Sequence, residues 1–261
     1  MASISLTDTL RQEYDNLFNT CIIIPSKAGV VESIINNINN NKSRYEAVSN
    51  LLNVPWYFIA VIHNMESSLN FNKHLHNGDP LTGRTTHVPD GRPKAGNPPF
   101  TWEESASDSL QMMNLHKWEE WTLPGILFKL EEYNGWGYRK KHPHILSPYL
   151  WSFSNHYSKG KYIADGTWSE TAVSNQCGSA VILRRMLELG ELKIQQTTVV
   201  PRIKENVLKY SAKKIPFGEE LQVFLNKFPG IFVKVDGAPG EKTSDAVKQV
   251  LGFYLKGDPR E

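Results

Sequence analysis

The 261-residue sequence lacks three features that would mark a specialised class of protein. It has only two cysteines, Cys21 and Cys177, both in apolar surroundings, so two buried free thiols are expected rather than a disulfide. No apolar run is long enough to span a membrane, so no membrane insertion is expected. The first residues, MASISLTDTLRQEYDN, lack the basic segment and apolar stretch of a secretory signal peptide, which predicts a chain made in the cytoplasm.

An excess of charge of either sign is also lacking. The chain carries 29 Lys and Arg against 27 Asp and Glu, a formal net charge of +2, which argues against a dedicated nucleic-acid binder. The sequence does have enough length for one large domain with a small module. It also has many aromatic residues, including 7 Trp and 10 Tyr.

The stretch from 54 to 71, VPWYFIAVIHNMESSLNF, organises the first part of the chain. Pro55 suits the first turn of a helix, and the residues from Trp56 to Ile62 carry no charge. A helix that is apolar on all sides is usually buried, and a carboxyl group at its end is partly desolvated. Desolvation raises the pKa of a carboxyl, so Glu66 is the candidate general acid for glycoside cleavage. The alternative is an ordinary exposed glutamate where a helix meets a loop.

A long irregular segment, 73–99, follows this helix and is dominated by Gly, Pro, Asn and Asp. Its turn signals predict an irregular β-hairpin or a pair of loops, and loops of this length in a compact domain are usually functional. Asp79 is the best second carboxylate, and Thr85 or Thr86 could help it to hold an attacking water. The alternative is that Asp79 only shapes the turn before the proline that follows it.

Histidines near Glu66 raise the question of a metal. His63, His74 and His76 are residues of a type that binds zinc. Their spacing matches neither HExxH nor another common zinc signature. We therefore predict no metal site and no cofactor.

Three further helices are predicted. Thr101 and Glu104 form a capping box that opens one helix. Thr122, followed two residues later by a proline, opens a second helix that ends at an Asn-Gly pair. The apolar period predicts a third helix over 171–189.

The end of the second helix carries flat aromatic faces beside glycines, in the sequence YNGWGY. Aromatic rings with nearby polar groups suit sugars, which have apolar faces and hydroxyl edges. The candidate substrate-binding residues are those of this segment and a histidine one turn before Glu66: Tyr133, Asn134, Gly135, Trp136, Tyr138 and His63.

A domain boundary is expected near residues 191–204, which are polar and lack a sustained period. The tail beyond it contains two helical patterns separated by turns. It is short for an elaborate active site, so a binding module is the natural interpretation.

The tail resembles the small helical peptidoglycan-binding domain of cell-wall hydrolases. The resemblance lies in LQVFL and VDGAPGEKTSDAV, which match that family's helix with LQ followed by DG, G, T and A. The longer first part resembles the lysozyme superfamily, including goose-type lysozymes and lytic transglycosylases, through HNMESS and EEYNGWG. Together they resemble a phage endolysin or a related wall hydrolase. The resemblance implies Glu66 as the acid and Tyr133, Asn134 and Gly135 as cleft residues, and it does not identify the second carboxylate.

The sequence therefore predicts an α+β protein, mostly α. A lysozyme-like catalytic domain with a small β-hairpin is expected over 1–195, and a peptidoglycan-binding domain over 205–261. The expected protein is a monomeric muramidase that acts on bacterial peptidoglycan after release from the cytoplasm. It would cut the β-1,4 bond between N-acetylmuramic acid and N-acetylglucosamine. The alternatives are a lytic transglycosylase, a zinc-dependent wall amidase or peptidase that uses His74 and His76, and a non-catalytic wall-binding protein.

Overall fold

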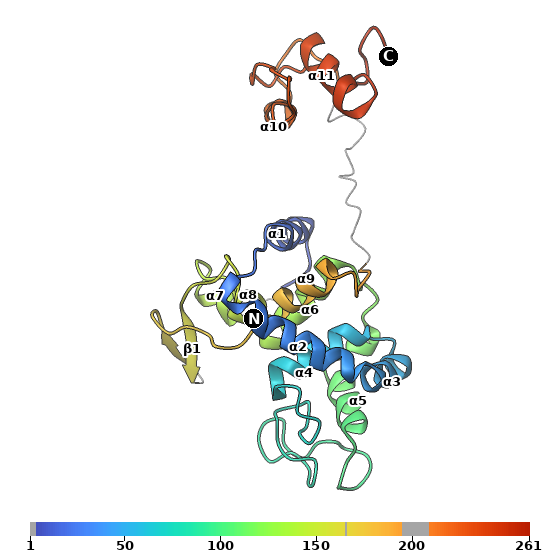
Figure 1. Cartoon of the computed structure of the whole chain (residues 1–261), viewed down its shortest axis with the longest axis vertical. Helices are drawn as coiled ribbons and strands as arrows, with labels where there is room; N and C mark the ends of the chain where they lie inside the picture. The colour runs from blue at the N-terminus through green and yellow to red at the C-terminus, as the bar shows by residue number, and fades with distance from the viewer. Residues whose placement is uncertain (1–3, 165, 195–208) are drawn as a thin grey trace. The chain divides into compact units, whose positions relative to one another are not determined.

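The computed structural model describes residues 4–164, 166–194 and 209–261 (Figure 1). Contacts divide the chain into two compact units, Met1–Gln196 and Thr197–Glu261. The predicted boundary at 191–204 lies largely outside the described residues. Within those ranges the chain forms eleven α-helices and one two-stranded antiparallel sheet, which confirms the α+β, mostly α class. No helix of the described part combines the length and apolar character needed to cross a membrane.

The first unit is a group of helices joined mostly by loops. Its elements are α1 (Asp8–Asn19), η1 (Pro25–Lys27), α2 (Ala28–Asn40), α3 (Lys42–Leu52), α4 (Trp56–Ser67), α5 (Trp102–Met112), η2 (Leu115–Lys117), α6 (Leu123–Asn134), α7 (Gly137–Lys141), α8 (Pro148–Trp151), β1 (Lys161–Ala164), β2 (Thr167–Ser169) and α9 (Ser179–Glu188). The capping box predicted at Thr101 and Glu104 opens α5, with both of its hydrogen bonds present. Both cysteines are buried and free, as predicted.

Helix α4 is the buried centre of this unit, as its uncharged sequence predicts. Side chains from Phe58 to Ile62 are fully enclosed, and α3 and α9 pack against the helix (Figure 1). The helix ends at Ser67 because the next two residues, Ser68 and Leu69, both adopt left-handed backbone conformations. Such a conformation is uncommon for a residue other than glycine, and two in succession turn the chain sharply just after Glu66.

Of the two forms predicted for the segment directly after Glu66, an irregular β-hairpin or a pair of loops, the structure has loops and no regular hairpin. The segment 68–101, all of it described, contains one isolated antiparallel bridge, between Lys73 and Pro80, and no regular strand. Proline cannot donate to a strand ladder, and five prolines occur between residues 80 and 99. The hairpin lies instead at β1–β2, where the strands pair antiparallel with a register shift between Tyr162 and Ala164.

The helix predicted over 171–189 begins later, at Ser179. Residues 171–178 have no regular secondary structure, and Val173 is 54% exposed. Gly178 packs closely on α8, because a Cβ atom there would lie 2.2 Å from the Leu150 carbonyl oxygen. The Gly178 N–H donates to the Ser152 carbonyl oxygen at 2.9 Å, so it is not bonded within an earlier helical turn.

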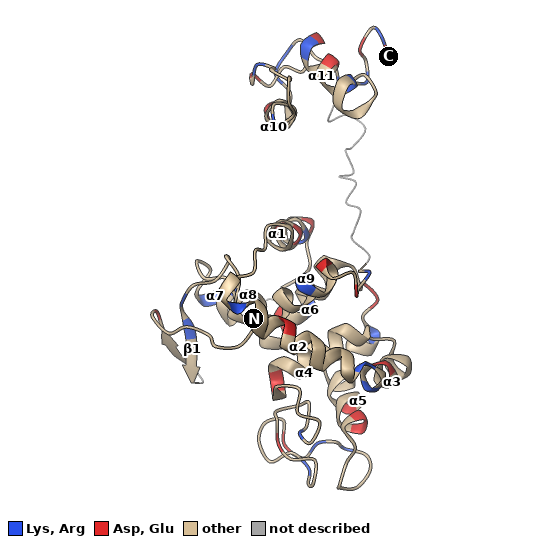
Figure 2. Cartoon of the chain, viewed as in Figure 1, with Lys and Arg blue, Asp and Glu red and all other residues tan. Residues whose placement is uncertain are grey.

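The second unit has its own small core between α10 (Gly218–Leu225) and α11 (Glu241–Leu251). Gln222 on α10 is buried and uses both ends of its amide. Its Oε1 accepts hydrogen bonds of 2.8 Å from the backbone N–H groups of Asp236 and Gly237. Its Nε2 donates to the Asp236 carboxylate at 3.0 Å. These bonds fix the Asp-Gly turn against the helix. Figure 2 shows residues of both charges interspersed over the helices of the two units.

Candidate active site

Glu66, the one charged residue of α4, lies in the last turn of that helix. The Tyr149 hydroxyl on α8 donates a hydrogen bond of 2.9 Å to its Oε1. Burial raises the pKa of Glu66 to about 7, and the hydrogen bond from Tyr149 acts in the opposite direction. A carboxyl with a pKa near the working pH can both hold and release a proton, as general acid catalysis requires.

A cavity of about 350 Å³ is lined by Tyr149, the hydrogen-bond partner of this carboxyl, while Glu66 itself is not one of the lining residues. That volume is at the lower end of the usual range for small-ligand sites. The α6–α7 turn, α8, the hairpin and the segment before α9 contribute its lining residues, which include Asn134, Gly135, Tyr138, Tyr149, Tyr162 and Gln176. Because Tyr149 both lines the cavity and bonds Glu66, the carboxyl lies one hydrogen bond from the cavity wall. The Gln176 amide also donates to the Met65 carbonyl oxygen at 2.6 Å, which ties the cavity to the last turn of α4.

The aromatic segment predicted to bind sugar is only partly in this cavity. Asn134, Gly135 and Tyr138 line it. Tyr133 instead lies within hydrogen-bond distance of the Ser109 hydroxyl, at 3.2 Å. Burial, and to a smaller extent the nearby Glu66 carboxyl, raises the pKa of Tyr133. Trp136 packs against the ring of Phe128 with centroids 5.0 Å apart, as part of the core.

His63, predicted to bind substrate, lies in the core of the first unit. Its side chain is fully buried, and its ring packs against Phe71 and Trp102 with centroids 4.6 Å from each. Its Nδ1 lies 2.9 Å from the Tyr45 hydroxyl. Burial lowers its pKa to about 4, so His63 is a neutral core residue at pH 7. An all-apolar helix gives no sign of which side faces the cleft, and His63 points into the core.

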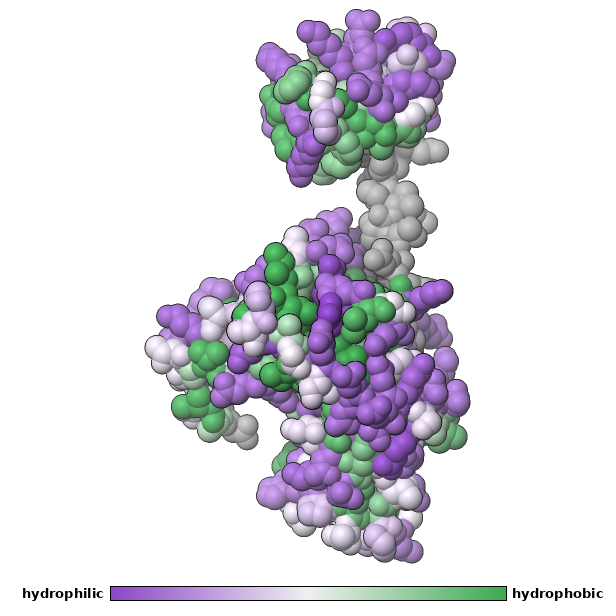
Figure 3. All heavy atoms as spheres, in the orientation of Figure 1, coloured by the Kyte–Doolittle hydropathy of each residue, from purple (hydrophilic) through white to green (hydrophobic). Residues whose placement is uncertain are grey.

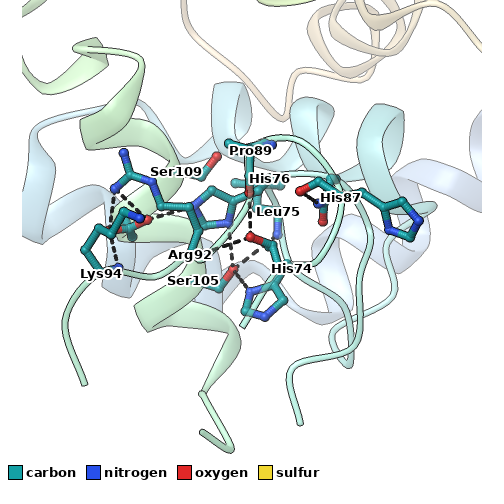
Figure 4. A network of polar contacts seen from close by, with 12 residues as sticks. His74, Leu75, His76, His87, Pro89, Arg92, Lys94, Ser105 and Ser109 are labelled. Atoms are coloured by element: carbon teal, nitrogen blue, oxygen red, sulfur yellow. Dashed lines mark hydrogen bonds and ion pairs between the residues drawn. The ribbon is translucent and has the colours of Figure 1, made fainter. Parts of the chain in front are cut away.

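Asp79 organises the loop that follows α4. Its Oδ2 accepts backbone N–H bonds from Thr86 at 2.8 Å and from His87 at 3.0 Å, and its Oδ1 lies 2.7 Å from the His87 Nδ1 (Figure 4). Burial favours the neutral acid, but these hydrogen bonds prevail and hold the pKa of Asp79 well below its usual range. The carboxylate is therefore ionised and shapes the turn. The neighbouring Gly78 packs against Glu66, with an ideal Cβ position 3.5 Å from the Glu66 carbonyl oxygen.

The two predicted threonines belong to the same loop. The Thr85 hydroxyl is buried, donates to the Pro89 carbonyl oxygen at 2.5 Å and accepts the Arg92 N–H at 2.9 Å. Thr86 is exposed and contacts Asp79 mainly through its backbone N–H. Both residues hold the loop in shape.

His74 and His76 attach this loop to α5. The Nδ1 of His74 lies 2.8 Å from the Ser105 hydroxyl, and the Nε2 of His76 lies 2.8 Å from the Asp108 carboxylate, which also pairs with Arg92 (Figure 4). In the described part of the chain, no three His, Cys, Asp or Glu side chains gather in a way that could hold a metal ion.

Two site residues escaped the sequence analysis. Tyr149 is 83 positions from Glu66 in the chain. Gln176 lies before α9, in residues 171–178, where the apolar period predicted a helix. The aromatic-rich stretch SPYLW contained Tyr149, but no local pattern selects it over its neighbours.

No family model, curated protein or solved structure matches this chain.

Proposed function

We propose that the first unit is a muramidase that cuts the β-1,4 bond between N-acetylmuramic acid and N-acetylglucosamine in bacterial peptidoglycan. The observation that carries the proposal is the Glu66 carboxyl at the end of a buried helix, with a pKa raised to about 7, one hydrogen bond from the wall of a cavity lined by tyrosines and amides. A sugar offers apolar ring faces to tyrosines and hydroxyl or N-acetyl groups to amides.

The hydrogen bond to Glu66 fixes how the proton would be delivered. Tyr149 donates to Oε1, so the acidic proton resides on Oε2 and is free to pass to the leaving glycosidic oxygen. After transfer the same hydroxyl stabilises the new carboxylate. The ionised Asp79 carboxylate would act as the second carboxylate, holding the attacking water together with Thr86 and accepting the proton that this water loses.

The second unit is proposed to bind the wall. It resembles a peptidoglycan-binding domain in the residues that build its fold, namely Gln222 and the Asp236-Gly237 turn that this amide holds. A wall-binding module joined to a wall-cleaving unit raises the local substrate concentration.

The decisive experiment replaces Glu66 with Gln. Glu66→Gln keeps the shape but has no acidic proton, so release of glycan fragments should fall by about a hundredfold or more. Melting temperature and wall binding should be retained. Mass spectrometry of the digest should find reducing-end muramic acid. Near-normal release by a folded Glu66→Gln protein would refute the proposal.

Two other experimental results would support the other interpretations. Cut peptide stems that disappear when a chelator is added would support a zinc-dependent wall amidase or peptidase. Binding to purified walls without any fragments would support a non-catalytic wall-binding protein.

A lytic transglycosylase acting on the same bond is a second candidate, favoured by the state of Asp79. Its carboxylate oxygens are already bonded to Thr86 and His87, which leaves less capacity to activate a water. A transglycosylase needs no attacking water and leaves anhydro-muramic acid. The same mass spectra therefore distinguish the two reactions.

A further inference from the structure

The β1–β2 hairpin has no role in the mechanism above, yet its residues line one side of the cavity. Tyr162 on β1 lies in the cavity wall next to Gly137, where a Cβ atom would be 3.4 Å from the tyrosine ring. The next residue on the strand, Ile163, is 60% exposed. In Figure 3 hydrophobic side chains are visible at the surface of the hairpin lobe, on the left.

The Tyr162 ring is held by other aromatic rings. Trp168 is its cross-strand partner, with ring centroids 5.2 Å apart, and Tyr138 on α7 meets it edge-on at 5.5 Å. His142 stacks flat on Trp168, with centroids 3.5 Å apart and planes 9° apart. Cross-strand and stacked aromatic pairs restrict the orientation of their rings.

The hairpin is also tied to the helix that carries Tyr138. The Tyr162 backbone N–H donates to the Tyr138 hydroxyl at 3.4 Å, and the Trp168 indole N–H donates to the Glu170 carboxylate at 2.7 Å. A two-stranded ribbon is only marginally stable alone, so these contacts supply the order that its backbone ladder does not. The outcome is a rigid, partly exposed aromatic face beside polar groups such as the Gln176 amide.

We propose that this hairpin is a substrate-binding wall: Tyr162 stacks on the apolar face of a pyranose ring of the glycan strand, and the Trp168–His142 pair positions Tyr162. The inference rests on the proposed glycosidase function and deepens it, because it identifies the element that holds the sugar next to Glu66. A flat aromatic ring recognises a sugar ring by its apolar face. If Tyr162 served only to pack against its neighbours, an aliphatic side chain would suffice at this position.

The test measures binding of a purified N-acetylglucosamine–N-acetylmuramic acid tetrasaccharide to full-length protein by calorimetry, in the Glu66→Gln background. Tyr162→Ala should weaken binding by about tenfold or more, and Tyr162→Phe should restore it, because the stacking face is retained. Ile163→Ala is the matched control on the same strand and should leave affinity unchanged. With Glu66 intact, Tyr162→Ala and Trp168→Ala should raise KM far more than they lower kcat, with melting temperatures near that of Ile163→Ala.

The outcomes separate this inference from the function on which it rests. If wild type releases glycan fragments while Tyr162→Ala binds the tetrasaccharide as tightly as Ile163→Ala, the hairpin role is wrong and the glycosidase stands. If wild type releases no fragments and the Glu66→Gln protein binds no tetrasaccharide, both proposals fail.

Discussion

At Glu66, burial and a hydrogen bond act on one carboxyl in opposite directions, and burial prevails, with a pKa of about 7. A general acid works only when protonated, so kcat/KM should be high below pH 7 and should fall as pH rises through that value. Tyr149→Phe removes the bond that lowers this pKa, so the fall should move to higher pH. A pH–rate profile measures both effects. Tyr57→Phe, at the other end of α4, is the control, and an unshifted profile for Tyr149→Phe would contradict the assignment.

The hydrogen bonds of Asp79 within its loop predict that replacing this residue lowers the stability of the protein as well as its activity. The folded-state pKa lies below its ordinary value, so the stabilisation is present above pH 4 and is lost as pH falls towards the folded pKa. Asp79→Asn cannot accept the same set of bonds from Thr86 and His87, and should lose about 1–2 kcal/mol of unfolding free energy at pH 7. Urea unfolding at pH 7 and pH 3 measures this. If the difference in unfolding free energy between Asp79→Asn and wild type were the same at pH 7 and at pH 3, the loop role would be refuted.

At the scale of elements, an ion pair between a buried glutamate and a partly buried arginine holds together the helices that carry the cavity residues. Glu131 on α6 bonds Arg139 on α7 at 2.8 Å and accepts the Tyr14 hydroxyl from α1 at 2.5 Å. The α6–α7 turn between the two charges contains the cavity residues Asn134 and Tyr138. The pair therefore fixes the ends of that turn.

Removing Glu131 leaves Arg139 with Glu13 as its remaining partner, at 3.0 Å, and leaves the buried Tyr14 hydroxyl without its acceptor. Glu131→Ala should lose about 1–3 kcal/mol of unfolding free energy and raise KM, because the turn loosens. The neighbouring Glu132, whose side chain is 36% exposed in its pair with Lys129, is the matched control, and Glu132→Ala should cost less than about 1 kcal/mol. Denaturant unfolding of both variants measures this, and equal losses would argue against the buried pair as the fixing contact.

At the scale of the whole molecule, two separate cores predict two separable activities. Among the described residues, the core cluster of the second unit, which includes Leu225 and Val247, has no member in common with the core cluster of the first. Truncation after residue 204 should therefore leave a folded unit that still cuts soluble glycan fragments. Its affinity for intact walls should fall, because the added binding site is gone. Sedimentation with purified walls measures the loss, and equal sedimentation of the truncated and full-length chains would remove the wall-binding role.

The sequence by itself determined the elements whose causes are local. The uncharged run from Trp56 to Ile62 made α4 a buried helix, and the capping box at Thr101 opened α5. Glu66 stood out for the same reason, because a lone carboxyl at the end of such a helix must be partly desolvated. The prolines of 73–99 also argue against a hairpin there, because proline cannot donate a hydrogen bond to a strand ladder.

Tertiary structure alone decided which side chains meet. Hydrophobic burial has no direction, so the sequence of α4 could not say that His63 faces the core while Glu66 bonds a tyrosine of the cavity wall. The hydrogen-bond partner of Glu66 comes from α8, and the cavity wall comes from a hairpin that is held by rings on another helix. Those contacts join segments far apart in the chain, and only the path of the whole backbone brings them together.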